Sequence, residues 1–357
     1  MTMRIRPCQL PCIPAITATL LALASSATVA QSSVSLYGLI DVGVQLNTTG
    51  APGSEWTKAM TSGNQSASRL GFRGSEDLGG GLQAIFNLEA GINTDAGDIA
   101  GYGTTAFFAR RSVVGLKGNF GQVMLGREYT PGFWNVHQLD RHAFGLPGTI
   151  STASQLQDSR ADNGIFYTSP SFGGVTGRLS YAFGESVAGK LLAGSVEYRD
   201  DRLFASAAVQ RRDVLAKPSL SSGNNLEGGF GLGYKFGRVS TNAGFWKTDV
   251  HATQSGALQA TKSIWVGLGI TSGVHALYGQ VARTEFDRIG AAGGRAFNYG
   301  VAYNYTLSKR TNLYAAYGGT NNDAGSSMAL QTGSVRVGGS VRGADPRALV
   351  VGVRHSF

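Results

Sequence analysis

Two groups of ionisable residues with opposite charge could act together in this chain. Arg69 and Arg73 fall on one face of a strand-like segment, and Arg178 shares the polar face of the segment 175–183. With Arg110, these side chains could form a basic wall. Guanidinium groups that line water favour anions, so the expected chemistry is electrostatic selection of small inorganic or organic anions.

The acidic group follows an irregular run, 130–162, that keeps neither a strand nor a helix period. Asp140 and Asp158 lie inside this run, with Glu128 at its entrance and Asp162 at its exit. Loops of this length are uncommon and usually functional. Opposite the arginines, these carboxylates would create a transverse electric field across a narrow aqueous constriction. The plainer alternative is that the arginines serve mainly as structural partners of the loop carboxylates.

Other kinds of chemistry find little support in the sequence. His137 and His142 flank Asp140, but their spacing in an irregular loop is not specific for a metal site. The stretches GLGYKFG and GLGITSG are strand glycines and not phosphate-binding loops, because no helix follows them. No Ser, His and acid set stands out at a spacing that would indicate a nucleophile. We therefore expect no metal, no cofactor and no enzymatic activity.

The segments that carry the arginines belong to a wider pattern of alternation. From 34 to 46, apolar side chains share one face and polar side chains share the other, and the pattern returns at 82–92, 175–183, 192–199, 230–236, 264–270 and 297–305. About sixteen such strands of roughly ten residues fit in the chain, which predicts an all-β fold. In a soluble sandwich the apolar faces would point inward, whereas in a transmembrane barrel they point to lipid.

The connections distinguish these two folds. Short turns are expected at 76–81, 118–121, 171–174, 200–202, 237, 272–273 and 307–310, and longer polar loops at 47–65, 215–225, 251–260 and 321–347. Short turns at one rim and long loops at the other are typical of an outer-membrane barrel. The run 130–162 would then fold into the pore. Because an open edge is not tolerated in lipid, the last strand, 348–357, should pair with 34–46.

A barrel fixes the direction of the arginines. A guanidinium that faces lipid near the membrane midplane would cost roughly 2 to 4 kcal/mol, so several arginines on strands are expected to line water. Arg110 joins this lining if Val113 and Gly115 face outward. The same parity turns Arg111 outward, which would place it in a subunit interface or indicate a different register.

The N-terminal segment 1–30 is typical of a secretory signal peptide. Two arginines precede an uncharged apolar segment, 13–30, that ends in small residues, and both cysteines of the chain lie in this leader. Cleavage after Ala30 would leave 31–357 as one barrel domain, and an uncleaved anchor is the alternative. The leader holds two of the 31 basic residues and none of the 22 acidic ones, so the mature chain would carry a formal charge of +7. This balance favours anionic solutes or partners.

The predicted mature chain resembles a known family along its whole length. The segments are SSVSLYGLIDVGVQLN, SRLGFRGSEDLGGGLQAIFNLEAGI, RRSVVGLKGNFGQVMLGREYTP, DNGIFYTSPSFGGV and the terminal VGVRHSF. They look like those of the Gram-negative trimeric general porins of the Burkholderia and Bordetella type. The resemblance implies a sixteen-stranded antiparallel transmembrane β-barrel in the outer membrane, a homotrimer, and a third loop folded into the pore. It also implies an inward side chain at Arg110 and passive diffusion of small hydrophilic solutes, commonly with anion preference.

The end of the chain carries a further part of this resemblance. Phe357 resembles the terminal signal for the barrel-assembly machinery, although His355 stands where that signal usually has an apolar or aromatic residue. The expected partners are this machinery, outer-membrane lipid, other copies of the chain and small anions, and not nucleic acid. The alternatives to a passive porin are a solute-specific channel for phosphate or dicarboxylates, which would show saturable conductance, and a barrel enzyme.

Overall fold

The computed structural model describes residues 33–101, 105–140, 145–185, 188–218 and 220–357. The expected signal peptide, 1–30, lies outside the described residues, as does His142. Among the residues described, no helix is both long enough and apolar enough to cross a membrane.

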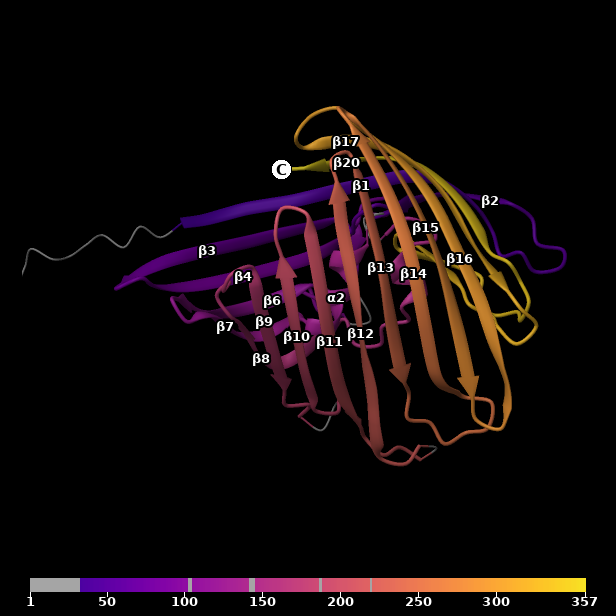
Figure 1. Cartoon of the computed structure of the whole chain (residues 1–357), viewed down its shortest axis with the longest axis horizontal. Coiled ribbons are helices and arrows are strands. Elements are labelled where there is room, and N and C mark those ends of the chain that lie inside the picture. Colours follow the sequence, from indigo (N-terminus) through magenta and orange to yellow (C-terminus); the bar gives the residue numbers. More distant parts are fainter. Residues whose placement is uncertain (1–32, 102–104, 141–144, 186–187, 219) are drawn as a thin grey trace, which may run out of the picture.

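Sixteen antiparallel strands close into a barrel (Figure 1), which confirms the predicted fold. They are β1 Ser33–Thr48, β3 Arg69–Gly79, β4 Leu82–Asn93, β6 Arg111–Gly118, β7 Gly121–Tyr129, β8 Arg160–Thr168, β9 Val175–Ala182, β10 Leu191–Arg199, β11 Leu203–Val214, β12 Gly223–Phe236, β13 Val239–Asp249, β14 Leu258–Ser272, β15 His275–Arg288, β16 Ala291–Thr306, β17 Thr311–Asn322 and β20 Arg347–Ser356. Four short strands lie in the connections: β2 Thr57–Ser62, β5 Asp98–Ile99, β18 Leu330–Thr332 and β19 Val335–Val337.

Apolar side chains face outward along the barrel strands, as expected for a barrel in a membrane. On β14, Ile264 and Val266 point outward and are 55% and 56% exposed, whereas Ser263 and Trp265, which alternate with them, point inward and are buried. Apolar side chains on the outside and polar or packed side chains on the inside reverse the order of a soluble sheet. The outer surface is therefore suited to lipid.

The first and last strands close the sheet, as predicted. Residues of β1 from Leu39 to Thr48 lie opposite β20, and Gly38 and Phe357 exchange two backbone hydrogen bonds of 3.1 Å. Closure removes the open edges, so each strand finds partners on both sides.

The predicted asymmetry of the rims is present, with one exception. All seven short turns fall between consecutive strands, where the sequence places them. On the opposite rim the connections are longer, but β15 and β16 are joined only by Ile289 and Gly290. Gly290 has a φ of 58°, the left-handed conformation that such a tight turn favours.

The polar loop predicted at 47–65 is present but contains a strand. The strand β2 pairs with 42–47 of β1, and residues of the following segment, 63–68, line the interior of the barrel. The carboxylate of Asp41 accepts hydrogen bonds from the backbone N–H groups of Gln65 at 2.8 Å and Ser66 at 2.7 Å. This inward segment narrows the lumen from the side of β1.

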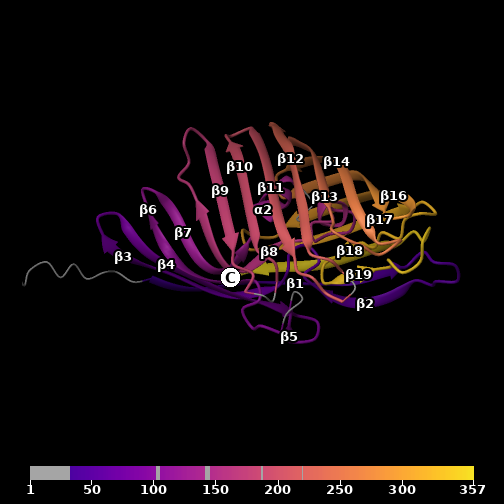
Figure 2. The ribbon, with the colours of Figure 1, turned by 90° about the horizontal axis from the view of Figure 1, so that it is seen from below.

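The run 130–162 enters the barrel, but the expectation that it lacks a helix is wrong. Helix α2 spans Pro131–Leu139 and the shorter α3 spans Ile150–Ala153. The Thr130 hydroxyl accepts a hydrogen bond from the backbone N–H of Phe133 at 3.2 Å, and a proline follows it in the first turn. Both are standard signals of a helix N-terminus. In Figure 2, α2 is enclosed by the strands.

The connection before β20 also reaches inward. Its hairpin, β18 and β19, donates a hydrogen bond from Thr332 Oγ1 to Gln45 Oε1 on β1 at 3.1 Å. The backbone N–H of Gly333 bonds to the carbonyl of Gly145 in the pore loop at 2.7 Å. Two connections therefore meet inside the barrel and leave a restricted passage.

Candidate functional site

Apolar packing holds the pore loop against one wall of the barrel. Val136 and Leu139 of α2 and Ile150 of α3 are buried against side chains from β11, β13 and β14. Trp246 and Trp265 form much of that surface and are 0% and 2% exposed. The loop is thus fixed by a dry contact that leaves the opposite face of α2 towards the lumen.

A polar anchor fixes the exit of the loop. The Glu227 carboxylate on β12 accepts hydrogen bonds from the backbone N–H groups of Gln157 at 3.0 Å and Asp158 at 3.1 Å. The Asp158 carboxylate in turn pairs with Arg212 on β11. Burial raises the pKa of Asp158, and the charge of Arg212 opposes that rise.

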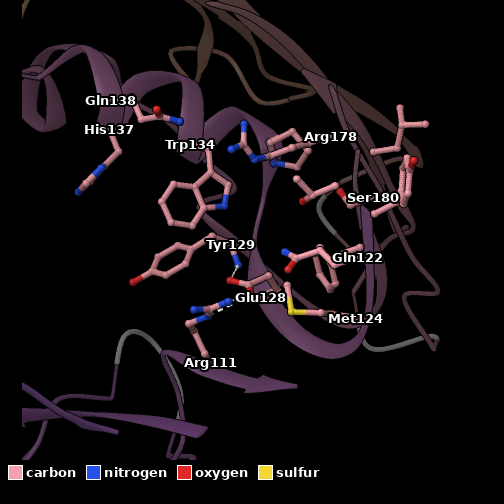
Figure 3. A pocket seen from close by; sticks show the side chains of 15 residues that line it. Arg111, Gln122, Met124, Glu128, Tyr129, Trp134, His137, Gln138, Arg178 and Ser180 are labelled. Carbon is pink, nitrogen blue, oxygen red and sulfur yellow. Dashed lines mark hydrogen bonds and ion pairs between the residues drawn. The ribbon is translucent and has the colours of Figure 1, made fainter. Parts of the chain in front are cut away.

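Two adjoining cavities lie inside the barrel beside the pore loop. The larger has a volume of about 1040 Å³ and lies beside β1, β3 and β4, and the smaller, of about 390 Å³, lies between α2 and β7 to β9. Arg111, Tyr129, Trp134 and His137 line both. Figure 3 shows these side chains around the smaller cavity. They mark the constriction between the two spaces.

The side-chain charge of the larger cavity has one dominant sign. The described residues that line it include one side chain with a carboxylate, Glu89. They also include six arginines: Arg69, Arg73, Arg110, Arg111, Arg160 and Arg354. One negative side chain against six positive ones leaves a strong excess of positive charge beside the constriction.

Arg69 and Arg110 meet at Glu89. The Nε of Arg110 bonds to Glu89 Oε1 at 2.6 Å, and the Nε of Arg69 lies 3.7 Å from Oε2. Tyr37 also donates its hydroxyl to Glu89 at 2.9 Å. Arg110 is buried and Arg69 keeps 27% side-chain exposure, so Arg110 acts mainly in the wall while Arg69 also faces water.

Arg73 and Arg178 lie apart from this cluster. The guanidinium of Arg73 is exposed in the lumen, 5.1 Å above the ring of Tyr37. Arg178 bonds to both carboxylate oxygens of Glu197 at 2.6 and 3.3 Å and lies 5.9 Å from the ring of Trp134. Arg178 thus lines the smaller cavity and not the larger one.

The expected outward direction of Arg111 is wrong. Val114 is 59% exposed on the lipid side, whereas Val113 is 4% exposed and packs inside, so the assumed parity of β6 is shifted by one residue. Arg111 therefore points inward and pairs with Glu128 on β7. Arg110 precedes the strand, is not bound by its alternation, and also reaches the interior.

Asp158 and Asp162 do not face the predicted arginines across the lumen, whereas Glu128, at the entrance of the loop, lines the smaller cavity and pairs with Arg111. Asp140 accepts a hydrogen bond from the backbone N–H of Ile150 at 2.9 Å, and Asp158 belongs to the anchor at Arg212. Asp162 is on the outer side of the barrel, where it pairs with Arg127. Among the described residues, the carboxylate side chains that border the two cavities are on strands. The negative side chains beside the constriction are therefore Glu128 and Glu89, and Asp158 and Asp162 do not contribute to it.

Several residues of the constriction escape prediction from the sequence. Arg160 stacks on Tyr129 at 4.2 Å from the ring and bonds to its hydroxyl at 2.7 Å. Glu89 and Glu197 share the inward face of their strands, and strict alternation could have identified them. Arg160 lies where the loop meets β8, and no periodic signal fixes its direction.

His137 on α2 lies at the junction of the two cavities. Its enclosure inside the barrel, and then the charges of Arg69 and Arg110, lower the pKa of the imidazole to about 4. The ring is therefore neutral at pH 7 and adds no charge to the constriction. Among the described residues no cluster of three or more His, Cys, Asp or Glu side chains could hold a metal ion.

Comparison with known proteins agrees with this architecture. The family model for Gram-negative porins matches residues 17–325. The chain belongs to the Gram-negative porin family. This porin is 34% identical to outer membrane porin protein 32 of Delftia acidovorans, over 94% of this chain and 97% of that protein. It is also 34% identical to an outer membrane porin protein of Bordetella pertussis, over 46% of each chain.

Solved structures show the same fold. The anion-selective porin from Comamonas acidovorans superimposes with a TM-score of 0.80 at 31% identity, covering 92% of this chain and 100% of that one. The Vibrio cholerae outer-membrane protein OmpT, solved in a trimer form, has a TM-score of 0.67 at 16% identity, which shows the fold alone. The predicted family is thus confirmed. The chain is an outer-membrane porin, a channel for passive diffusion and not an enzyme.

Proposed function

We propose that this porin prefers anions. The observation that carries the proposal is the lining of the larger cavity, where six arginines face one carboxylate side chain. Formal charges beside a narrow aqueous passage raise the local concentration of counter-ions and repel ions of like sign. The relative from Comamonas acidovorans is described as anion-selective, which supports the same preference here.

The ion pairs reduce this charge without cancelling it. Glu89 is shared between Arg69 and Arg110, so one negative charge serves two positive ones. Unit charges 4 Å apart interact by about 1 kcal/mol in bulk water and about 4 kcal/mol at an effective dielectric constant of 20. A bias of this order changes relative permeability severalfold without binding a chloride ion tightly. It also weakens with salt, because the screening length falls from about 8 Å at physiological strength to about 3 Å at 1 M.

The zero-current potential in a planar bilayer under a KCl gradient tests the proposal. We expect the sign for chloride permeation in the wild type, and a reduced or reversed potential when Arg69, Arg73 and Arg160 are replaced together by Gln. Arg110 is left intact because it is buried in the wall. The matched control is Arg211→Gln, since Arg211 pairs with Asp213 at an exposed position on the outer side. A cation-selective wild type, or a triple variant that behaves like the control, contradicts the proposal.

Assembly and export belong to the same proposal. We expect a homotrimer, as the resemblance to the trimeric general porins implies, and chemical cross-linking of the purified porin in detergent tests it. Residues 1–30 act as a cleaved signal peptide, which N-terminal sequencing of the mature protein tests. Phe357, which is 45% exposed and bonds to Gly38 through its backbone, is the signal for the barrel-assembly machinery. Removing it should lower the amount of folded porin in the outer membrane.

A further inference from the structure

The smaller cavity differs from the larger one in shape and in chemistry. It measures about 390 Å³ and lies between α2 and the wall formed by β7, β8 and β9. Because it shares Arg111, Trp134 and two further residues with the larger cavity, a solute that passes the constriction meets it next. Its volume suits a small organic molecule better than a single hydrated ion.

Two guanidinium groups reach this cavity from different strands. Arg111 comes from β6 and is oriented by Glu128, and Arg178 comes from β9 and is oriented by Glu197. Each carboxylate holds its arginine in a fixed direction, so the N–H groups are positioned before a solute arrives. Each of these arginines is paired with one carboxylate, so the positive charge that draws an anion towards the cavity comes from the adjoining arginine-rich cavity.

The space between the arginines is aromatic. Trp134 lies centrally, with Tyr129 at 5.5 Å and the guanidinium of Arg178 at 5.9 Å from its ring (Figure 3). Phe166 and Met124 on the wall opposite α2 are inward and buried. A flat apolar surface beside a cation favours a flat apolar solute that carries a negative charge.

A buried hydroxyl supplies a second, independent observation. Ser180 on β9 is 4% exposed and lines the cavity, yet its Oγ has no hydrogen-bond partner among the residues described. An unsatisfied buried hydroxyl is costly unless a ligand or a water completes it. Gln122 and Thr168 add polar groups to the same wall. Together they offer hydrogen bonds to the oxygens of a solute.

We propose that this cavity is a solute site for planar aromatic carboxylates of about the size of benzoate. The ring stacks on Trp134, and the carboxylate bonds to Arg178 or Arg111 with Ser180 as a further donor. Binding is weak and reversible, because each arginine already has a carboxylate partner. The proposal rests on the anion preference proposed above and adds a specific solute class to it.

Benzoate block of the chloride current in a planar bilayer tests the site. Wild-type current should fall saturably as benzoate is added, and acetate at the same concentrations should have a much smaller effect because it lacks the ring. The variant Trp134→Leu should need about tenfold more benzoate for half-block, whereas Trp134→Phe should stay close to the wild type. The matched control is Trp56→Leu, since Trp56 is 52% exposed outside the barrel strands and far along the chain from the cavity.

The outcomes separate the two proposals. If the zero-current potential shows anion preference but benzoate blocks no better than acetate, the aromatic site is refuted and the anion-preferring porin stands. If Trp134→Leu and Trp56→Leu need equal benzoate for half-block, the assignment of the ring contact to Trp134 is refuted. A wild-type porin that is cation-selective would refute both the proposed anion preference and the proposed aromatic carboxylate site. Ser180→Ala gives a further check, because it leaves the packing almost unchanged and should weaken benzoate block by a smaller factor than Trp134→Leu.

Discussion

The two walls of the lumen are built by different physical means. The wall of β11 to β14 holds the pore loop through buried aromatic and aliphatic side chains, with Trp246 at its centre. The wall of β3, β4 and β6 presents arginine side chains to the lumen. Glu89 orients two arginines of this wall, Arg69 and Arg110. The first wall sets where the loop lies, and the second sets what passes it. Position and selectivity can therefore be altered separately.

The largest effect on stability should come from removing the apolar contact between the pore loop and the wall of β11 to β14. Trp246→Ala opens a cavity under α2, and replacing a large buried aromatic residue typically costs about 3 to 5 kcal/mol. We expect a lower melting temperature by circular dichroism in detergent, with larger and noisier single-channel currents as the loop loosens. The control is Phe230→Ala, because Phe230 is 59% exposed on the lipid side. Equal melting temperatures for the two variants would show that the loop is not held by this contact.

A smaller effect is expected at the polar anchor. Glu227→Gln replaces one of the two carboxylate oxygens that accept the backbone N–H groups of Gln157 and Asp158 by an NH2 donor, and loss of such a buried acceptor costs about 1 to 3 kcal/mol. The loop exit should fluctuate more, which would appear as more frequent brief closures in single-channel records. Glu285→Gln, at an exposed outward position, is the control. An unchanged closure frequency would mean that apolar packing alone fixes the loop.

The smallest expected effect is a change in anion preference with pH, caused by His137 at the constriction. The pKa of His137 is lowered from its ordinary value of 6.5 to about 4, first by its enclosure in the barrel and then by Arg69 and Arg110. The side chain is exposed to lumen water, and the ring gains its proton as the pH falls through about 4. That proton adds positive charge to the constriction, so anion preference should increase on acidification. The same lowered pKa means that His137 favours the folded state fully above pH 6.5 and less as the pH falls towards 4.

His137→Asn isolates this contribution. The variant keeps a polar side chain but does not titrate, so the difference in zero-current potential between pH 7 and pH 4 should be smaller than in the wild type. An identical difference in both proteins would assign the pH response to other groups.

The sequence predicts the barrel far better than it predicts the interior. Strand faces follow from a period of two, and lipid enforces that period along sixteen strands, so the fold and the seven short turns could be derived. The direction of Arg111 was missed because a shift of one residue reverses every side chain of β6. Arg110, only one position away, lies before the strand and follows no period.

The pore loop shows why the site was harder. Thr130 and the proline after it indicate a helix, but a helix of nine residues is short enough to be hidden in a run of about thirty. The partners of Asp140, Asp158 and Asp162 depend on how the loop lies against strands far away in the sequence. Local chemistry identified the charged residues, whereas only tertiary structure decides which of them meet.

The pairing of β1 with β20 has a consequence for how the molecule forms. These strands stand at opposite ends of the described chain, so their contact closes the longest loop in the fold. Closing it requires every intervening strand to be present, and folds dominated by such distant contacts form slowly. A chain that stops short of β20 would leave two exposed edges facing each other across a gap. The barrel wall therefore becomes continuous only after the whole polypeptide has been synthesised and delivered, because β20 must be present to pair with β1.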